Sequence, residues 1–153
     1  MRIITLNANG IRSAAGKGLF DWFKRQRADV LCLQETRAER EQLVDAHYFP
    51  RGWHVHYHVA RSKRGYSGVA IYARREPDAV FDTLGWAPFD EEGRYLELRF
   101  GQLSVVSLYL PSGSSSEERQ AFKYRVLEWL TPKLAEWRAS GREYVLCGDW
   151  NIA

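Results

Sequence analysis

The chain has 153 residues, a length typical of one domain or of part of a larger one. Hydrophobic residues make up 45% and charged residues 27%, which excludes a disordered tail, a collagen-like chain and a coiled coil. The 22 Lys and Arg residues against 19 Asp and Glu residues give a formal charge of +3, which permits nucleic-acid binding without requiring it.

The apolar runs also indicate where the protein acts in the cell. No stretch approaches the ~20 apolar residues of a membrane span, and the N-terminus lacks the hydrophobic region of a signal peptide. Cys32 and Cys147 lie inside apolar runs and form no Cys-x-x-Cys pair, which favours buried thiols over a disulfide. We therefore expect a cytoplasmic protein in a reducing compartment, with no membrane association.

The hydrophobic pattern alternates between short strands and longer helices. The predicted strands span residues 3–6, 30–33, 53–59, 68–73, 94–100, 103–110 and 144–147. The strands at residues 3–6 and 144–147 are predicted to be buried, and a loop is predicted over residues 111–116. Strands interleaved with helices predict a layered domain of the α/β or α+β class.

Three helices are predicted. A helix over residues 18–27 would place Leu19, Trp22 and Phe23 on one face, and a short helix is expected within residues 37–45. The longest helix follows the loop, and six of its residues recur at helical spacing as a core-facing stripe: Phe122, Val126, Trp129, Leu130, Leu134 and Trp137. Its predicted N-terminal capping box pairs Ser115 with Glu118, and Pro132 is expected to kink or split it before it ends at Gly141.

Polar side chains follow three of the predicted strands. Asn7 ends the first strand, Glu35 the second, and Asp149 and Asn151 the last. Each segment alone is also typical of a polar turn or of a strand leaving the core, because Asn and Asp cap turns readily. Neighbouring strands would bring these oxygen-bearing side chains to one sheet edge, where Mg²⁺ with few protein ligands could bind.

Five motifs in this order resemble the exodeoxyribonuclease III branch of the endonuclease/exonuclease/phosphatase superfamily, which includes apurinic/apyrimidinic endonucleases. They are Leu-Asn-Ala-Asn-Gly-Ile-Arg at residues 6–12, Leu-Gln-Glu-Thr-Arg at 33–37, Gly-Tyr-Ser-Gly-Val-Ala at 65–70, Tyr-Leu-Pro at 109–111 and Gly-Asp-Trp-Asn-Ile-Ala at 148–153. The resemblance implies a four-layered αββα sandwich and hydrolysis of DNA phosphodiesters in base-excision repair. It further implies dependence on Mg²⁺, with Mn²⁺ as a substitute, and a double-stranded DNA substrate with an abasic site or a 3′ end.

The resemblance also assigns roles to individual residues. Glu35 and Asn7 would hold or orient the metal, with Asp149 and Asn151 completing the set around it. Asp149 would orient and deprotonate the attacking water, and Asn151 would steady the nucleophile. Tyr109 would contact the scissile phosphate or the leaving oxygen, although a tyrosine at a strand end is by itself an ordinary structural feature. These roles fit in-line attack on a phosphodiester, which needs a positioned water, a base and positive charge on the phosphate.

The loop before the fourth predicted strand carries the expected DNA contacts. Arg61, Lys63 and Arg64 lie beside Tyr66, and the matching segment of the family approaches the DNA backbone. Arg37 is a further candidate, at a position where relatives commonly have Lys. The alternative for this loop is a solvated hairpin connection.

Three alternating histidines, His54, His56 and His58, share one face of a predicted strand. Such a face could bind a transition metal, but no acidic or cysteine partner lies nearby in the sequence. We expect an exposed strand face instead.

The motifs match the whole chain but only about the first three-fifths of the family domain. The sequence therefore predicts that residues 1–153 are the N-terminal part of a single nuclease domain whose C-terminal part is absent. Such a chain would be poorly stable or would associate, and its catalysis would be weak. Two alternatives remain open: a catalytically silent DNA-binding fragment, and a superfamily phosphodiesterase acting on a phosphoinositide, sphingomyelin or poly(A). No obligate protein partner is evident.

Overall fold

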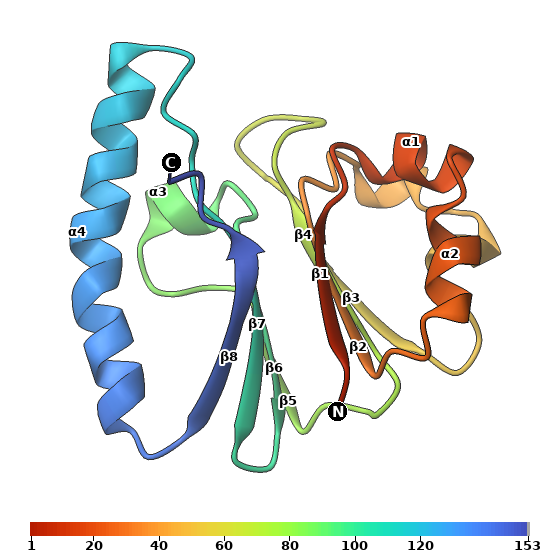
Figure 1. Cartoon of the computed structure of the whole chain (residues 1–153). Coiled ribbons are helices and arrows are strands. Elements are labelled where there is room, and N and C mark those ends of the chain that lie inside the picture. The colour runs from red at the N-terminus through yellow and green to blue at the C-terminus, as the bar shows by residue number, and fades with distance from the viewer. Residues whose placement is uncertain (153) are drawn as a thin grey trace.

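Two mixed β-sheets pack face to face, and helices cover the outer side of each (Figure 1). This computed structural model describes residues 1–152. The first sheet has the order β1-β2-β4-β3 and contains β1 (Ile3–Asn7), β2 (Val30–Gln34), β4 (Val69–Ala73) and β3 (His54–His58). The second has the order β5-β6-β7-β8 and contains β5 (Ala79–Phe81), β6 (Tyr95–Phe100), β7 (Leu103–Tyr109) and β8 (Glu143–Asp149).

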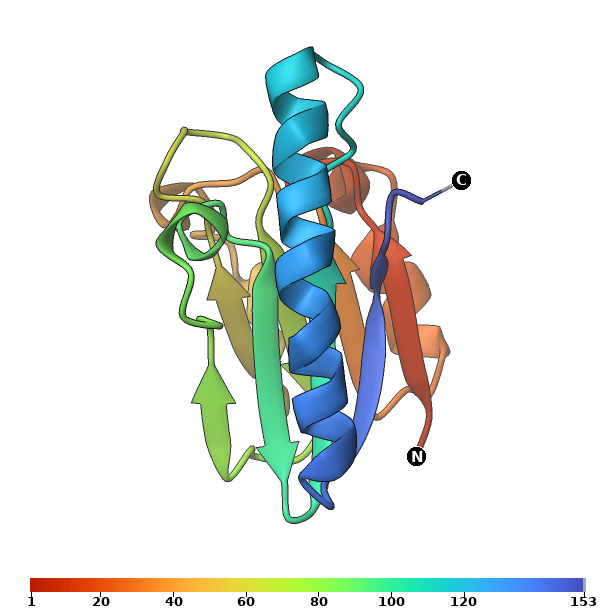
Figure 2. The ribbon, with the colours of Figure 1, turned by 90° about the vertical axis from the view of Figure 1, so that its left-hand side faces the viewer.

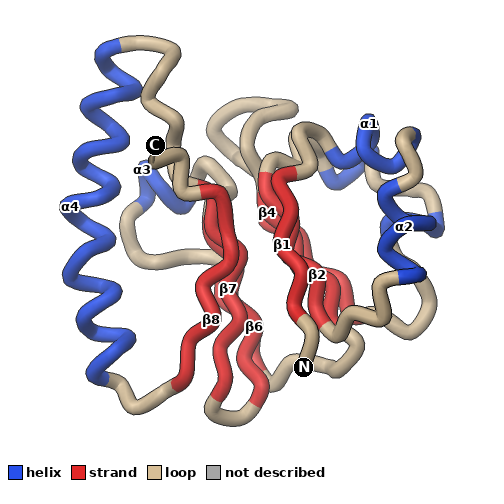
Figure 3. The backbone as a smooth tube through the Cα atoms, in the orientation of Figure 1, coloured by secondary structure: helices blue, strands red, loops and turns tan. Residues whose placement is uncertain are grey.

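The helices complete the predicted four-layered αββα arrangement. Helices α1 (Ile11–Gly16) and α2 (Leu19–Arg25) cover the first sheet, with the 3₁₀ turns η1 (Arg40–Gln42) and η2 (Ala46–Tyr48). Helices α3 (Ala87–Asp90) and α4 (Glu117–Ala139) cover the second, and α4 runs along its outer face (Figures 2 and 3). Within residues 1–152, no helix combines the length and the apolarity needed to cross a membrane.

Side-chain alternation along β2 explains why two sheets can stack. Leu31 and Leu33 pack under α1 and α2, whereas Val30 and Cys32 point to the second sheet. Every residue of β2 is buried, so its first four residues are apolar on both faces and the fifth, Gln34, is hydrogen-bonded to the second sheet. The order of strands then places the carboxyl ends of the parallel pairs β1–β2 and β7–β8 at the same end of the sandwich.

The helices of the N-terminal half differ from the predictions in three ways. The inward residues of α2 are Leu19, Phe20 and Phe23, while Trp22 lies at the surface. The short helix α1 was not predicted because only its first residue is buried, which leaves no apolar period to detect. The helix predicted within residues 37–45 is wrong: only the 3₁₀ turn η1 forms there, and Arg37, with a φ of 46°, is not in a right-handed helical conformation.

Helix α4 also differs from its prediction at two points. It begins one residue later, because the Ser116 side chain accepts a hydrogen bond from the Arg119 N–H at 3.2 Å and caps the helix in place of Ser115. It runs without interruption through Pro132. Pro132 and Glu128, whose carbonyl loses its partner, are both exposed, so water can satisfy the freed group. The strand β5 and the helix α3 were not predicted.

The sandwich is open along one side. β1 and β8 are edge strands, lie next to each other, and are only partly buried along their length. The predictions of fully buried strands at residues 3–6 and 144–147 are therefore wrong. Leu6 of β1 is 38% exposed.

The three histidines of β3 do not form an exposed face. Val55 and Tyr57 pack toward α1 and α2, so the histidines point to the opposite face of the sheet. His58 is buried, and its Nδ1 lies 2.8 Å from the carbonyl oxygen of Tyr95 in the other sheet. His54 and His56 are half-buried. His58 therefore links the two sheets structurally.

Candidate active site

The strand registers bring the predicted site residues to one end of the sandwich. Asn7 lies beside Gln34 across the β1–β2 pair, and Tyr109 lies beside Asp149 across the β7–β8 pair. Below them the sheets are joined by Ser107, which accepts a hydrogen bond from Gln34 Nε2 at 2.9 Å. The candidate residues therefore sit on strand ends that the core holds at a fixed separation.

Asn7 connects the two carboxylates directly. Its Nδ2 donates to Glu35 Oε1 at 2.9 Å and to Asp149 Oδ2 at 2.8 Å. Its Oδ1 accepts from the Asn9 N–H at 2.9 Å, so the amide oxygen is used in a local turn. Asn7 therefore orients the two carboxylates, and residues separated by 142 positions in the chain meet at one point.

Glu35 is held in its ionised form. Burial raises the pKa of this carboxyl, but hydrogen bonds from Asn7 and Tyr109 and the charge of Arg37 outweigh burial and keep the pKa below its ordinary value. Arg37 forms an ion pair with Glu35 Oε2. Burial and the neighbouring Glu35 together raise the pKa of Tyr109 to about 12, so its hydroxyl keeps its proton at neutral pH.

Strained backbone surrounds these side chains. Glu35, Arg37 and Ser67 have φ values of 52°, 46° and 48°, in the left-handed region that such residues rarely adopt. Hydrogen bonds hold the strained turn on both sides: the Gly10 N–H donates to the Glu35 carbonyl at 2.7 Å, and the Arg37 N–H to the Ser67 carbonyl at 2.9 Å. Strain that neighbouring segments enforce in this way is typical of functional sites.

Asp149 and Asn151 form a turn at the end of β8. The Asn151 N–H donates to Asp149 Oδ1 at 3.0 Å, and Asn151 Nδ2 donates to the Leu110 carbonyl at 2.7 Å, which directs Asn151 Oδ1 away from that carbonyl. Lys123 of α4 also holds this turn, since its Nζ donates a hydrogen bond to the Asn151 carbonyl at 2.6 Å. Sequence reasoning missed Lys123, which looks like an ordinary helix lysine.

An open cleft of about 580 Å³ lies over this end of β1 and β8. It is lined by Thr5, Leu6, Asn7, Gln34, Gly148, Asp149, Trp150, Asn151 and Ile152. Gly148 is required at its position, because a Cβ there would overlap the Leu108 carbonyl oxygen of β7. Because Asp149 and Asn151 line the cleft, a substrate bound there would contact both residues directly.

The donor set fits a hard divalent cation with few protein ligands. Glu35 Oε2 is buried and accepts no hydrogen bond, and its contact with Arg37 shows that this oxygen takes a positive charge. The available ligand atoms are carboxylate and amide oxygens, the type that Mg²⁺ prefers. No group of three or more His, Cys, Asp and Glu side chains suited to a metal occurs in the described residues.

Comparison with known proteins assigns the chain to a family. The model of the endonuclease/exonuclease/phosphatase family matches residues 4–153. The chain belongs to this family. An exodeoxyribonuclease of Bacillus subtilis is 34% identical over 154 residues, which are all of this chain and 59% of the relative.

Two solved structures of the family share the fold. An AP endonuclease from Archaeoglobus fulgidus superposes with a TM-score of 0.79 and 32% identity, covering all of this chain and 58% of that one. The 3′ phosphatase NExo from Neisseria, bound to a product DNA hairpin, gives a TM-score of 0.85 and 25% identity, again over all of this chain and 58% of that one. The chain thus spans less than three fifths of the length of these family members, and the resemblance to the N-terminal part of such nucleases is confirmed.

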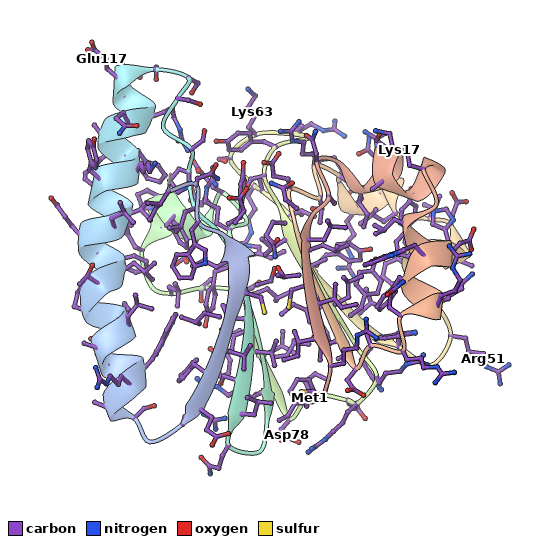
Figure 4. All side chains as sticks on the ribbon, in the orientation of Figure 1. Met1, Lys17, Arg51, Lys63, Asp78 and Glu117 are labelled. Atoms are coloured by element: carbon purple, nitrogen blue, oxygen red, sulfur yellow. The ribbon has the colours of Figure 1, made fainter. Side chains whose placement is uncertain are left out.

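The residues predicted to bind DNA lie in two places around the candidate active site. Arg37 is turned to Glu35 in an ion pair. Arg61, Lys63 and Arg64 are exposed on the loop before β4, at the same end of the molecule as the cleft; Lys63 projects outward there in Figure 4. Tyr66 is half-buried at the base of this loop.

Sequence reasoning missed a second polar cluster beside the loop. Glu92, Arg94 and Arg119 meet under Tyr66, and Arg94 is almost fully buried. Glu92 and Arg94 are separated only by Gly93, and Arg119 lies in the first turn of α4. Neither feature indicates an ion cluster when a single sequence is read. The pairing emerges only when the start of β6 and the start of α4 come together.

Proposed function

We propose that this chain provides catalytic residues of a Mg²⁺-dependent hydrolase of DNA phosphodiesters that acts in base-excision repair, at abasic sites or at 3′ ends. The relatives named above are an exodeoxyribonuclease and an AP endonuclease, and one structure holds DNA. The chain covers 59% or less of these relatives, so the activity of the whole enzyme is part of the proposal.

The observation that carries the proposal is the pair of hydrogen bonds from Asn7 to Glu35 and Asp149. One amide holds Glu35, whose buried Oε2 is paired only with the half-exposed Arg37, next to a second carboxylate at the mouth of a cleft. The Glu35 carboxylate is suited to binding a cation, and the Asp149 carboxylate is suited to binding a water molecule in the cleft. A polar turn without function has no need for this arrangement.

Each residue then has a chemical task. Glu35 would hold Mg²⁺, which would supply positive charge to the phosphate oxygens when bound. Asp149 accepts the proton of the attacking water while Asn7 and the Asn151 N–H keep its carboxylate in place. Asn151 Oδ1 orients that water. Tyr109, which keeps its proton because its pKa is raised to about 12, donates a hydrogen bond to a phosphate oxygen.

The loop at residues 61–66 supplies sequence-independent affinity for the DNA backbone. Its lysine and arginines lie at the cleft end of the molecule and are exposed. Contacts of this kind weaken steeply with salt because counterions are released on binding. The proposed partner is therefore duplex DNA.

A cleavage assay tests the proposal. Purified chain is mixed with a labelled duplex carrying one abasic site, and with an undamaged duplex with a free 3′ end, in Mg²⁺, in Mn²⁺ and in EDTA. We expect metal-dependent cleavage that Asp149→Asn reduces by about 10²- to 10⁴-fold, because it removes the general base. Glu143→Gln, at the far end of the same strand and exposed, is the matched control and keeps the activity.

The other outcomes discriminate between the alternatives. Salt-sensitive DNA binding with no cleavage at any Mg²⁺ concentration would support a silent DNA-binding protein. Hydrolysis of poly(A) or a phosphoinositide, with abasic DNA left intact, would assign a different substrate to the same site. Either result would refute the proposed DNA hydrolase.

A further inference from the structure

A buried ion cluster, Glu92–Arg94–Arg119, lies between the basic loop and the candidate active site. Arg94 Nε donates to Glu92 Oε2 at 2.6 Å, and the two side chains are 2% and 11% exposed. Arg119 reaches the same carboxylate from α4 with two hydrogen bonds, of 2.7 Å and 2.9 Å. Hydrogen bonds from both guanidinium groups and their charges outweigh burial and lower the pKa of Glu92, so this carboxylate is ionised and neutralises one of the two cations.

Both arginines also hold Tyr66. Arg94 Nη2 donates to the Tyr66 hydroxyl at 2.9 Å, and Arg119 Nη2 donates to it at 3.1 Å. A phenolic oxygen that accepts two N–H groups has only its own O–H left to donate, and that proton must point away from the arginines. Tyr66 lines a pocket of about 330 Å³ together with Ser62, Lys63, Glu92, Ser115 and Arg119.

The same cluster supports Tyr109 on the catalytic side. Arg94 Nη1 donates to the Tyr109 carbonyl at 3.1 Å, and the Tyr109 N–H donates to the Arg94 carbonyl at 2.9 Å. The guanidinium carbon lies 4.7 Å from the centre of the Tyr109 ring, a cation–π distance. Tyr109 in turn contacts Glu35. One buried arginine therefore touches both tyrosines.

Backbone contacts anchor the start of the loop to the segment that carries the cluster. The Arg61 N–H donates to the Glu91 carbonyl at 2.7 Å. A Cβ on Gly93 would lie 2.7 Å from the Ala60 nitrogen, so this close approach needs a glycine. The loop is thus fixed at its first residues by backbone and at Tyr66 by the two arginines.

We propose that Glu92, Arg94 and Arg119 are positioning residues that hold the DNA-binding loop at Tyr66 in a fixed place relative to Tyr109 and the catalytic carboxylates. This inference rests on the proposed function for its role in DNA binding, while the tether itself is a property of the fold. The guanidinium fork of Arg119 matters to it, because it makes two parallel hydrogen bonds to Glu92 and a third to Tyr66, whereas a lysine ammonium has three donors without this planar, fixed geometry.

The test compares charge-conserving variants. Arg119→Lys keeps the net charge and removes the fork; Tyr66→Phe keeps the ring and removes the shared hydroxyl. Arg125→Lys, an exposed arginine of the same helix, is the matched control. The first measurement uses no DNA: the rate of trypsin cleavage within residues 61–64, divided by the rate at exposed Arg51 at the opposite end of the molecule, which corrects for global unfolding.

We expect both variants to raise this ratio roughly tenfold, because each breaks charge-assisted hydrogen bonds that close the loop, and the control to leave it unchanged. The double variant should add little to either single change. A ratio unchanged in Arg119→Lys and Tyr66→Phe would overturn the proposal.

The second measurement is the affinity for a fluorescein-labelled abasic duplex in EDTA. We expect Arg119→Lys to weaken binding several-fold at constant charge. If the trypsin ratio rises but DNA affinity is the same in all variants, the positioning role in binding is overturned. If wild-type protein neither binds nor cleaves DNA, the proposed function fails, and the trypsin ratio still decides whether the cluster holds the loop.

Discussion

The two polar clusters at the cleft end of the sandwich differ in how completely their charges are paired. Around Glu92, every carboxylate oxygen accepts charged hydrogen bonds and the guanidinium groups are shared among fixed partners. Around Glu35, one buried oxygen accepts no hydrogen bond and meets only a half-exposed arginine. The saturated cluster is suited to holding structure, and the unsaturated one is suited to binding a ligand.

The placement of the two clusters reinforces this contrast. The Glu92 cluster lies at the starts of β6 and α4, away from the open edge. The Glu35 cluster lies where β1 and β8, both edge strands, come together under the cleft. Substitutions in the first should therefore change stability, and substitutions in the second should change ligand binding.

The largest effect on folding is expected from Glu92→Ala. It leaves Arg94 buried without its carboxylate, and breaking a buried ion pair on one side costs about 3–5 kcal/mol. Urea unfolding followed by circular dichroism measures the loss. The neighbouring exposed Glu91→Ala should change the unfolding free energy by less than about 0.5 kcal/mol. Equal effects of the two substitutions would show that the cluster contributes nothing beyond a surface charge.

A smaller loss is expected from Gly148→Ala, which acts on the other side of the comparison. The added methyl group would overlap the Leu108 carbonyl, so β7 and β8 must move apart at a cost of about 1–3 kcal/mol. The same shift should displace Asp149, the next residue, and reduce cleavage more than folding. Gly16→Ala, where a Cβ would meet open space, is the control and should be neutral or slightly stabilising. Activity retained at full level in Gly148→Ala would mean that the strand end tolerates movement.

The chemistry-bearing strand ends could be predicted from sequence because the signal is local. Asn7, Glu35 and Asp149 each follow an apolar run, and the parallel pairing of β1 with β2 brings the first two together. The expectation of a single sheet edge is wrong for Asp149, which belongs to the second sheet and reaches Asn7 because the edge strands β1 and β8 lie together. The helix stripe of α4 was predicted for the same reason, since burial repeats with the helical period.

The rest could not be predicted because it depends on long-range partners. Arg119 carries no mark of its bond to Glu92, 27 positions away. The left-handed turn at Arg37, where the predicted helix would start, is held by hydrogen bonds that the Thr36 and Arg37 N–H groups donate to the Gly68 and Ser67 carbonyls. His58 was assigned to an exposed face, although the second sheet covers it. Neighbours that pack from elsewhere in the chain decide each of these cases.

The pH dependence of the unfolding free energy tests whether the Glu92 cluster stabilises the fold through its charge. The pKa of Glu92 is lowered by its hydrogen bonds to Arg119 and by Arg94, despite the opposing effect of burial. A carboxyl with a lowered pKa in the folded state contributes stability that is present above its unfolded pKa and is lost as the pH falls through the folded pKa. The stability difference between wild type and Glu92→Gln should therefore be largest at neutral pH and should shrink below about pH 4. A difference that stays constant from pH 7 to pH 3 would show that the ion cluster does not contribute through its charge.

The smallest effect is expected at Arg37, where the unsaturated cluster is only loosely paired. Its guanidinium occupies the oxygen of Glu35 that a divalent cation would use, and its side chain is 48% exposed. Half-exposed ion pairs contribute about 0.2–1 kcal/mol, so removing the competitor with Arg37→Gln should tighten Mn²⁺ binding by at most about fivefold, measured by calorimetry. Exposed Arg40→Gln leaves the ion pair intact and should not change the Mn²⁺ affinity, which separates local competition from a general change in charge. Weaker Mn²⁺ binding in Arg37→Gln would mean that this arginine helps to shape the cation site and does not compete with the cation for Glu35.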